Sequence, residues 1–493
     1  MKRLVPIFRF GLSIIFITLF LLQTHAWADP FADALKAYNK GDYKTAFVLY
    51  EKLAKAGHPR AQNNLGNMYD VGQGVEQNLA KAAHWYKLAA EKGHKIAQYN
   101  LANMYDYGQG IEQNFGEAMK WYTKAAEQDF AKAENNIAIM YDKGKGVEKD
   151  FEKAAEWYTK SAEKGFAKAQ YNLANMYLVG EGVPQDLQKA ALWFRKAADQ
   201  GHAKAQFKLG NMFDKGQGVP RSYEEAAKWY KKAAENGMPR AQFNIGNMYD
   251  FGQGVKQNRE KAVAWYRKAA DQGFSSAQNS LGNMYDRGLG VPKDMKAAYE
   301  WYKKAADQGH PVAQFNLGTM YEYGQGVKQD YAKSMEWYVK AARQGHAPSQ
   351  HHIGLMYDQG TGVPKNVRTA AQWYEKAAEG GLALAQYHIA TMYELGEGVL
   401  QNFQKAAEWY QKAADQGHAL SQNYLGTLYH QGKGVERDFV KAHMWYNLSA
   451  LRIAEGKYLD MVIKNRDAVT RLLTPAQLNE AQRLAGEWKP KKE

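Results

Sequence analysis

The sequence predicts an all-α fold: a right-handed α-solenoid, or superhelix, of antiparallel helix pairs with a 36-residue repeat. Three observations predict it. Eleven tryptophans, from Trp85 to Trp445, follow one another every 36 residues without an insertion. A pair of glycines one residue apart recurs in the same register, from Gly72 and Gly74 onward. Apolar residues between these landmarks have helical spacing, so each unit can cover the apolar face of its neighbour.

Residues 1–28 are predicted to be an export signal that is cleaved after Ala28. Three basic residues open the chain, a short apolar stretch runs from Phe10 to Leu22, and Ala26-Trp27-Ala28 has the small-x-small pattern of a cleavage site. The apolar stretch is short for a transmembrane helix, although an uncleaved membrane anchor is the alternative. We therefore expect a periplasmic or secreted protein with no membrane span after cleavage.

Residues 29–60 are predicted to form a capping helix pair, and residues 61–456 to form eleven repeats. Positions are counted from the first residue of each repeat (Ala61, Ala97 and so on to Ser421). Helix A of the first repeat carries Ala61, Leu65, Met68 and Tyr69 on one face. Gly72 follows that face, and glycine tolerates the left-handed conformation that ends helices. The paired glycines therefore mark the turn of a helical hairpin, and the strand-turn-helix setting of a phosphate-binding loop is absent.

Helix B of each repeat is predicted to start at a short polar N-cap. Its inner face in the first repeat carries Ala82, Trp85, Tyr86 and two further alanines, and the two aromatic residues are expected to supply most of the buried area. All eleven N-cap residues can accept hydrogen bonds from free backbone N–H groups. They are Asn78, Asn114, Asp150, Asp186, Ser222, Asn258, Asp294, Asp330, Asn366, Asn402 and Asp438.

Residues 457–493 are predicted to form C-terminal capping helices and a basic tail. Thr474 and Pro475 start the last helix, with Gln477 as the capping-box partner. Leu478, Ala481, Ala485 and Trp488 then make one apolar stripe. We expect this stripe to cover the last repeat; docking of a partner is the alternative.

The unit "AQYNLANMYDYGQGIEQNFGEAMKWYTKAAEQDF", residues 97–130, closely resembles the Sel-1-like repeat, a relative of the tetratricopeptide repeat. The resemblance covers residues 61–456 and suggests an exported bacterial member of that family. It implies a superhelix with helix A on the concave face and helix B on the convex face. It also implies an adaptor or scaffold, because members act in signalling, in export and assembly machinery, and in bacterial contact with host cells.

Composition argues against several other functions. The chain has no cysteine, which excludes disulfides, thiolate metal sites and cysteine nucleophiles. No catalytic motif is present, and the acidic residues recur at surface positions, so we expect no enzyme, no cofactor and no metal. A cysteine-rich branch of the family is linked to β-lactam hydrolysis, but the lack of cysteine here argues against that activity. The formal charge of +14 is spread thinly, which favours acidic partners but not nucleic acid.

Candidate binding residues point outward from helix A. Position 4 is rich in asparagine, whose amide can both donate to and accept from a peptide backbone. Nearby aromatic residues could take partner side chains. The alternative is an asparagine ladder that only ties repeats together, with the aromatics half-buried between helices. The candidates are Asn64, Asn100, Asn136, Asn172, Asn244 and Asn316, with Tyr99, Tyr171, Phe207, Phe243 and Phe315.

Three histidines form a second candidate patch. His94, His202, His310, His346 and His418 recur in the loop before helix A and belong to the repeat. His351, His352 and His388 do not, and His352 and His388 share position 4 of adjacent repeats. Stacked pairs lie roughly 10 Å apart, so zinc would need reaching rotamers, and a distinct binding patch is favoured over a metal site. The sequence thus predicts an exported scaffold for a protein or peptide partner, with a cell-wall or polysaccharide-associated assembly factor as the alternative.

Overall fold

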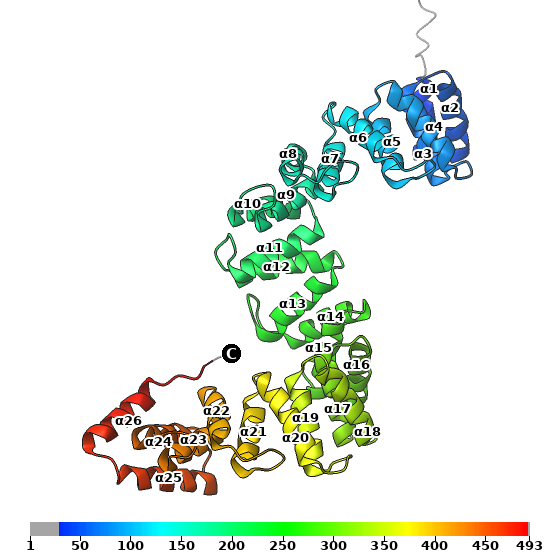
Figure 1. Ribbon diagram of the computed structural model, residues 1–493. Helices are drawn as coiled ribbons and strands as arrows, with labels where there is room; N and C mark the ends of the chain where they lie inside the picture. Colours follow the sequence, from blue (N-terminus) through cyan, green and yellow to red (C-terminus); the bar gives the residue numbers. More distant parts are fainter. Residues whose placement is uncertain (1–28, 492–493) are drawn as a thin grey trace, which may run out of the picture. The chain divides into compact units, whose positions relative to one another are not determined.

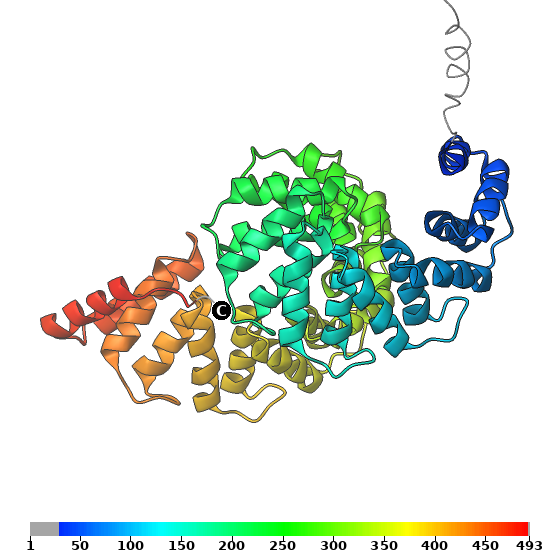
Figure 2. The same ribbon diagram turned by 90° about the horizontal axis from the view of Figure 1, so that it is seen from above.

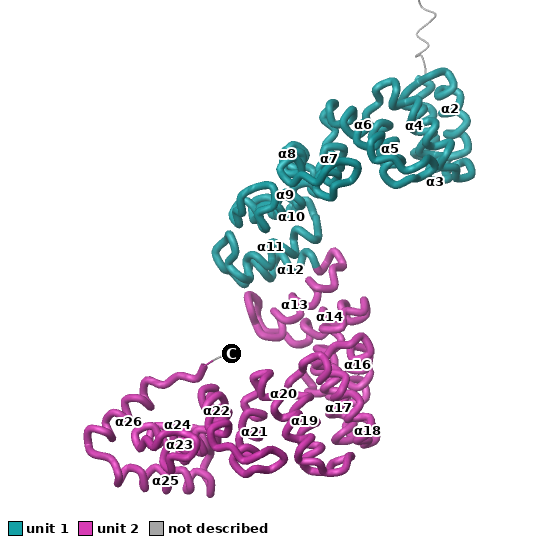
Figure 3. Tube along the Cα trace, in the orientation of Figure 1, with its two compact units in different colours: residues 1–233 teal, residues 234–493 magenta. Residues whose placement is uncertain are grey.

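The computed structural model describes residues 29–491, in which every regular element is an α-helix. The predicted export signal, residues 1–28, lies outside the described residues. The chain divides into two compact units, residues 1–233 and 234–493 (Figure 3). Each unit is described by itself.

The helices of the first unit follow the predicted alternation of helix A and helix B. They are α1 (Pro30–Asn39), α2 (Tyr43–Lys55), α3 (Pro59–Val71), α4 (Leu79–Glu91), α5 (Lys95–Tyr107), α6 (Phe115–Ala126), α7 (Ala131–Lys143), α8 (Phe151–Glu163), α9 (Ala167–Val179), α10 (Leu187–Asp199), α11 (Ala203–Lys215) and α12 (Tyr223–Glu235), whose last residues belong to the second unit.

The second unit continues the same alternation and ends with two further helices. Its helices are α13 (Pro239–Phe251), α14 (Arg259–Asp271), α15 (Ser275–Arg287), α16 (Met295–Asp307), α17 (Pro311–Tyr323), α18 (Tyr331–Ala342), α19 (Ala347–Gln359), α20 (Val367–Glu379), α21 (Ala383–Leu395), α22 (Phe403–Asp415), α23 (Ala419–Gln431), α24 (Phe439–Ala450), α25 (Lys457–Thr470) and α26 (Pro475–Glu487).

Neighbouring helices pack in chain order. Helix A contacts helix B of its own repeat, and helix B contacts helix A of the next repeat, as with α3, α4 and α5. Successive pairs lie side by side within each unit in both views (Figures 1 and 2). The predicted fold class, an α-solenoid of antiparallel helix pairs, is confirmed.

The apolar face and end of helix A are as predicted. Leu65 and Met68 are fully buried, and Tyr69 nearly so. Gly72 has a φ of 78°, and its N–H donates to the Met68 carbonyl at 2.9 Å. This left-handed residue stops the helix because its backbone can no longer continue the α-helical ladder.

Side-chain caps hold the start of helix B in all eleven repeats and the start of helix A in five of them. All eleven predicted N-caps of helix B accept a backbone N–H bond, for example Asn78 Oδ1 from the Lys81 N–H at 2.9 Å. Sequence analysis missed the caps of helix A. The Nδ1 atoms of five loop histidines accept from the N–H three residues on, at 3.2–3.3 Å. They are His58, His94, His202, His310 and His418. The Nδ1 atom can accept only while it is unprotonated.

The second glycine of each pair has a role beyond the turn. A Cβ atom on Gly290 would lie 2.5 Å from the carbonyl oxygen and carbon of Arg259, the first residue of helix B in the preceding repeat. Ten such glycines, from Gly74 to Gly434, face that residue of the preceding helix B in the same way. The A–B loop therefore packs against the repeat before it.

Of Trp85 and Tyr86, the two aromatic residues expected to supply most of the buried area, the tyrosine is the more deeply buried. Tyr86 is buried, as are its equivalents in the other repeats, whereas Trp85 and six other repeat tryptophans are only half-buried. These tryptophans lie at the edge of helix B. In nine repeats a lysine three residues later covers the ring at 3.9–4.5 Å, as Lys124 covers Trp121, which adds a cation–π contact.

The C-terminal helix starts as predicted, with a capping box between Thr474 and Gln477. Ala481 and Ala485 are buried, and Trp488 meets Trp445 of the last repeat with ring centroids 6.3 Å apart. The apolar stripe is therefore occupied by the chain's own last repeat. Among residues 29–491, no helix combines the length and apolar character that a bilayer span requires.

Candidate functional site

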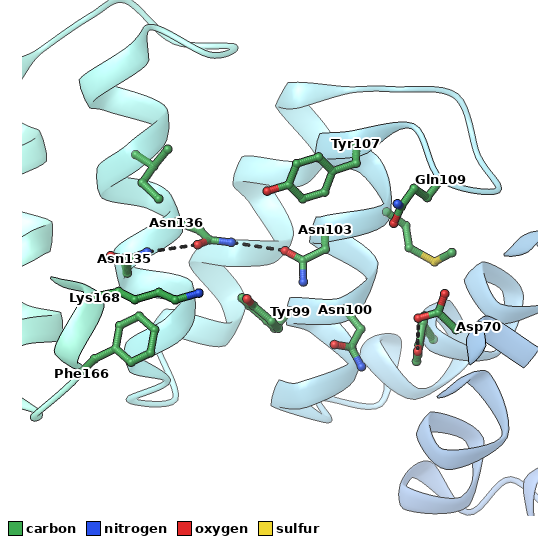
Figure 4. Close-up of a pocket in the computed structure, with 13 residues that line it drawn as sticks. Asp70, Tyr99, Asn100, Asn103, Tyr107, Gln109, Asn135, Asn136, Phe166 and Lys168 are labelled. Carbon is green, nitrogen blue, oxygen red and sulfur yellow. Dashed lines mark hydrogen bonds between the residues drawn. The ribbon is translucent and has the colours of Figure 1, made fainter. Parts of the chain in front are cut away.

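A hollow opens on the surface formed by successive A helices in the first unit. Its volume is about 500 Å³, and its wall comes mainly from α3, α5, α7 and the start of α9, with Tyr86 added from α4. Figure 4 shows Asn103, Asn136 and Asn135 in a row, flanked by Tyr99 and Tyr107. The lining residues are Asp70, Tyr86, Tyr99, Asn100, Asn103, Met104, Tyr107, Gln109, Asn135, Asn136, Ile139, Phe166 and Lys168. Three predicted residues, Tyr99, Asn100 and Asn136, thus come together here.

The amides in the hollow are partly used by the fold. Asn136 Nδ2 donates to Asn103 Oδ1 at 3.3 Å, and Asn100 Nδ2 donates to Asn63 Oδ1 and Asn67 Oδ1 of the preceding repeat at 3.3 and 3.4 Å. Because an amide offers two donors and one acceptor oxygen, Asn103 Nδ2 and Asn100 Oδ1 keep capacity for a partner. These groups can bind backbone N–H and C=O groups of an incoming chain.

The rim of this hollow carries two residues, Tyr107 and Lys168, that were not among the predicted binding residues. Lys168, exposed at the start of α9, brings a cation, and Asp70 brings a carboxylate from α3. Tyr107, at the end of α5, is 60% exposed. A surface that offers amides, both charge signs and an exposed aromatic ring suits a polypeptide better than a purely apolar ligand.

The other position-4 asparagines differ in their contacts. Asn316 Nδ2 donates to Asn279 and Asn283 at 3.1 and 3.5 Å, and Asn172 Nδ2 donates to Asn135 at 3.4 Å. Asn64 Oδ1 accepts from Asn63. Asn244 makes no side-chain hydrogen bond within residues 29–491, although it is half-buried like the others. The ladder therefore links some repeats and leaves others unlinked.

This difference gives a matched pair of variants. We expect Asn316→Ala to lower the free energy of unfolding by about 1 kcal/mol, because it removes hydrogen bonds between repeats. Asn244→Ala should change it by less than about 0.5 kcal/mol. Urea titration followed by circular dichroism measures both. Equal losses in the two variants would show that the ladder does not stabilise the repeats.

Positions 7 and 10 of helix A serve the buried tyrosine of helix B. Tyr122 OH donates to Asn103 Oδ1 at 2.6 Å, and Tyr338 OH donates to Glu322 Oε2 at 2.5 Å. In two repeats position 7 is threonine and position 10 is the longer glutamate, which reaches the hydroxyl itself: Thr319 with Glu322, and Thr391 with Glu394. Burial raises the pKa of Tyr122 and Tyr338 above their usual range, so both remain hydroxyl donors. The oxygen atoms that bind the tyrosine at these two positions therefore serve the fold, whereas Asn103 Nδ2 takes no part in this contact.

The five predicted aromatics are half-buried between helices. Tyr171 packs on Phe194 and on His202, with ring centroids 5.7 and 4.8 Å away. Phe315 similarly contacts Tyr338 and His346. Tyr99, Phe207 and Phe243 each contact the tyrosine of their own helix B. Much of the surface of each ring is therefore buried against neighbouring side chains. Of the five, only Tyr99 lines the hollow.

The three predicted histidines meet on α19 and α21. The ring centroids of His351 and His388 are 5.2 Å apart, and His388 stacks on Tyr374 at 4.9 Å. His352 Nδ1 lies 3.4 Å from Glu322 Oε2 without hydrogen-bond geometry, so this is an ion pair only when His352 is protonated. Burial lowers the pKa of His351 to about 3, and its Nε2 has no partner among the described residues.

These histidines do not form a metal centre. In the described range 29–491, no three histidine or acidic side chains converge in an arrangement that could hold a metal ion. His351 is only 3% exposed, so it is closed to a partner as well. The cluster is an aromatic part of the helix packing with half-buried edges at His352 and His388.

Stacked helix pairs with a polar hollow on the A helices define a helical-repeat scaffold, a class that presents extended surfaces for binding. The family model for the Sel1 repeat matches twelve segments. They are residues 37–58, 59–94, 95–130, 131–166, 167–202, 203–238, 239–274, 275–310, 311–346, 347–382, 383–418 and 419–452. The chain belongs to the Sel1 repeat family.

Two solved structures are similar to this chain. The crystal structure of c5321, described as a protective antigen of uropathogenic Escherichia coli strains with an SLR fold, is 34% identical with a TM-score of 0.78; the match covers 90% of this chain and 94% of that one. A Sel1 repeat protein from Oxalobacter formigenes is 36% identical with a TM-score of 0.55, over 63% of this chain and 90% of that one. Neither is described as an enzyme. No curated protein matches the chain.

Proposed function

We propose that this Sel1 repeat protein is an exported scaffold that holds a segment of a protein partner on the surface of its A helices. The hollow over α3, α5 and α7 carries this proposal, because amide groups left free there can pair with a peptide backbone. Tyr107 and Lys168 at its rim add an apolar and a charged contact. Binding would need no reaction and no cofactor.

A glycan partner has less support than a polypeptide. Sugars stack on exposed aromatic faces, and the five aromatic candidates use much of their surface within the helix packing. A hydrolase has less support still. The two similar solved proteins are described as an antigen and a repeat protein, and the chain has no cysteine.

The proposal is tested by site-specific photocrosslinking in the cell that expresses the protein. A photoreactive amino acid replaces Tyr107 at the hollow or, as a matched control, Val48 on α2, which is similarly exposed at 62%. We expect a crosslinked polypeptide from position 107 only. We also expect Lys168→Ala to lower the yield of this crosslinked polypeptide. Crosslinks that resist protease but yield to glycosidase would favour the glycan, and identical products from both positions would refute the site.

Export is tested on the protein purified from the same cells. If the signal is cleaved after Ala28, N-terminal sequencing of the purified chain should begin at Asp29, and the protein should fractionate with the periplasm or medium. A chain that keeps Met1 and sediments with membranes would instead support the uncleaved anchor.

A further inference from the structure

The last residue of helix A, position 11, alternates in character from one repeat to the next. In the even-numbered repeats it is large and apolar and projects into solvent, with 57–68% of its surface exposed: Tyr107, Val179, Phe251, Tyr323 and Leu395. In the odd repeats from the third onward it is basic or polar: Lys143, Lys215, Arg287, Gln359 and Gln431. The first repeat, with Val71, departs from the pattern.

Position 17, in the A–B loop, alternates in the same phase. Even repeats carry a glutamine that donates to the backbone carbonyl at position 10, as Gln257 does to Asp250 at 2.7 Å. Odd repeats from the third onward carry a cation there: Lys149, Arg221, Lys293, Lys365 and Arg437. Single apolar residues on a surface need no explanation, but two positions that alternate together do.

The two positions belong to one surface. Position 12 is the glycine that ends helix A, and a Cβ atom built on it would lie 3.2–3.4 Å from the position-17 Cβ, as for Gly288 and Lys293. The A–B loop of each repeat therefore presents either an apolar side chain or cations. Position 16 does not follow the alternation, since even repeats have Lys256 and Lys328 there.

The fold does not require this alternation. Helix A ends at the same left-handed glycine in odd and even repeats, with φ of 68° at both Gly252 and Gly288. The buried leucine or isoleucine of helix A and the buried aromatic ring of helix B are also the same kind of residue in both. The apolar side chains of the alternation leave apolar surface in contact with water, which is unfavourable. A binding partner that contacts these side chains would explain why they alternate.

We propose that the partner is a protein segment in which apolar side chains alternate with carboxylates at an interval of two repeats. This rests on the proposed function and adds the chemistry of the partner. Phe251, Tyr323 and Leu395 of the second unit receive the apolar side chains, and the cations of the repeats between them receive the carboxylates. Helix pairs stack about 10 Å apart, so loops of the same character, which are two repeats apart, are separated by roughly 20 Å. This distance is the length of about six residues of extended chain.

Within the first unit, Tyr107 is both a position-11 residue and part of the hollow's rim. A backbone bound by Asn100 and Asn103 could thus place a side chain against Tyr107. An anionic membrane would also attract apolar and basic loops, but a bilayer has no period and would be served as well by apolar residues in every repeat. The alternation favours a polypeptide.

A random-peptide display library selected on the full chain, purified from the cell that expresses it, tests the proposal. An apolar-loop variant carries F251S, Y323S and L395S. A basic-loop variant carries R287Q, K293Q and K365Q, and glutamine is native to position 17 of even repeats. A control variant carries L451S, Y458S and L472S, three exposed apolar residues in the C-terminal part. Circular dichroism confirms that each variant is folded.

We expect the native chain and the control variant to enrich peptides with spaced apolar and acidic residues. The apolar-loop variant should bind them about tenfold more weakly and lose the apolar preference, and the basic-loop variant should lose the acidic one. If all variants select the same peptides, the proposal is wrong while the scaffold function stands. If the native chain selects none, both fail. If the chain binds phosphatidylglycerol vesicles and the same substitutions abolish that binding, the proposal is wrong and the partner of this surface is a membrane.

Discussion

Gly290→Ala is expected to lower the free energy of unfolding by about 4 kcal/mol or more, a large effect for one methyl group. Gly290 has a φ of 69°, and the added Cβ would lie 2.5–2.8 Å from three backbone atoms at the start of α14. Backbone atoms cannot turn aside as a flexible side chain can. The loop must leave the preceding repeat, which opens the interface between α14, α15 and α16.

Gly309→Ala in the same repeat is the matched control. Gly309 also has a left-handed backbone, with a φ of 86°, but a Cβ there would meet nothing within 4 Å. Its cost is the conformational strain alone, about 1–2 kcal/mol. Stability in a solenoid is local, so hydrogen exchange by mass spectrometry is the appropriate readout. Similar protection in α14–α16 for both variants would mean that the close approach does not hold the repeats together.

Much of the scaffold could be predicted from sequence because its determinants are local. The capping side chain at Asn78, the left-handed glycine at Gly72 and the apolar spacing of Leu65 and Met68 all act within a few residues. Their 36-residue recurrence then fixes which helices become neighbours. The contact of Gly290 with Arg259 could not be read this way, since it joins two repeats and depends on how closely they stack.

The candidate site was less predictable for a related reason. Composition alone cannot tell whether a half-buried amide is free or bonded to the preceding repeat: Asn316 is bonded and Asn244 is not. Similarly, Tyr86 and Trp85 are adjacent aromatics, yet only Tyr86 points into the core. The exposed alternation at Phe251 and Arg287 was visible in the sequence, but its meaning depends on knowing that both positions face solvent.

Acid is expected to destabilise the second unit around α19 and α21 well before its carboxylates are protonated. Burial, with smaller contributions from His388 and His352, lowers the pKa of His351 from 6.5 to about 3. Above pH 6.5 the imidazole is neutral in both the folded and the unfolded chain. Between pH 6.5 and 3 the unfolded chain binds a proton that the folded chain does not. The free energy of unfolding therefore decreases as the pH is lowered from 6.5 to 3, by up to about 1.4 kcal/mol per pH unit.

Other histidines add to the same trend. Burial lowers the pKa of seven more: His94, His202, His310, His346, His388, His418 and His443. Four of them (His94, His202, His310 and His418) cap helix A through an unprotonated Nδ1, so protonation also removes a hydrogen-bond acceptor. For His388 the nearby Asp358 acts in the opposite direction. The loss should thus extend along the repeats, with the largest single contribution at His351.

His351→Asn isolates that contribution, because asparagine is the native residue at position 3 of four other repeats, including Asn279 and Asn423. Urea unfolding at pH 7.5 and pH 4.5, with hydrogen exchange in α19–α21, should show the native chain losing on the order of 2–3 kcal/mol more than the variant between the two pH values. His84→Asn, at an exposed site on α4, should lose as much as the native chain. If His351→Asn does the same, protonation of His351 does not govern the acid sensitivity, and the closely packed rings around His351 must admit water and charge in the folded chain.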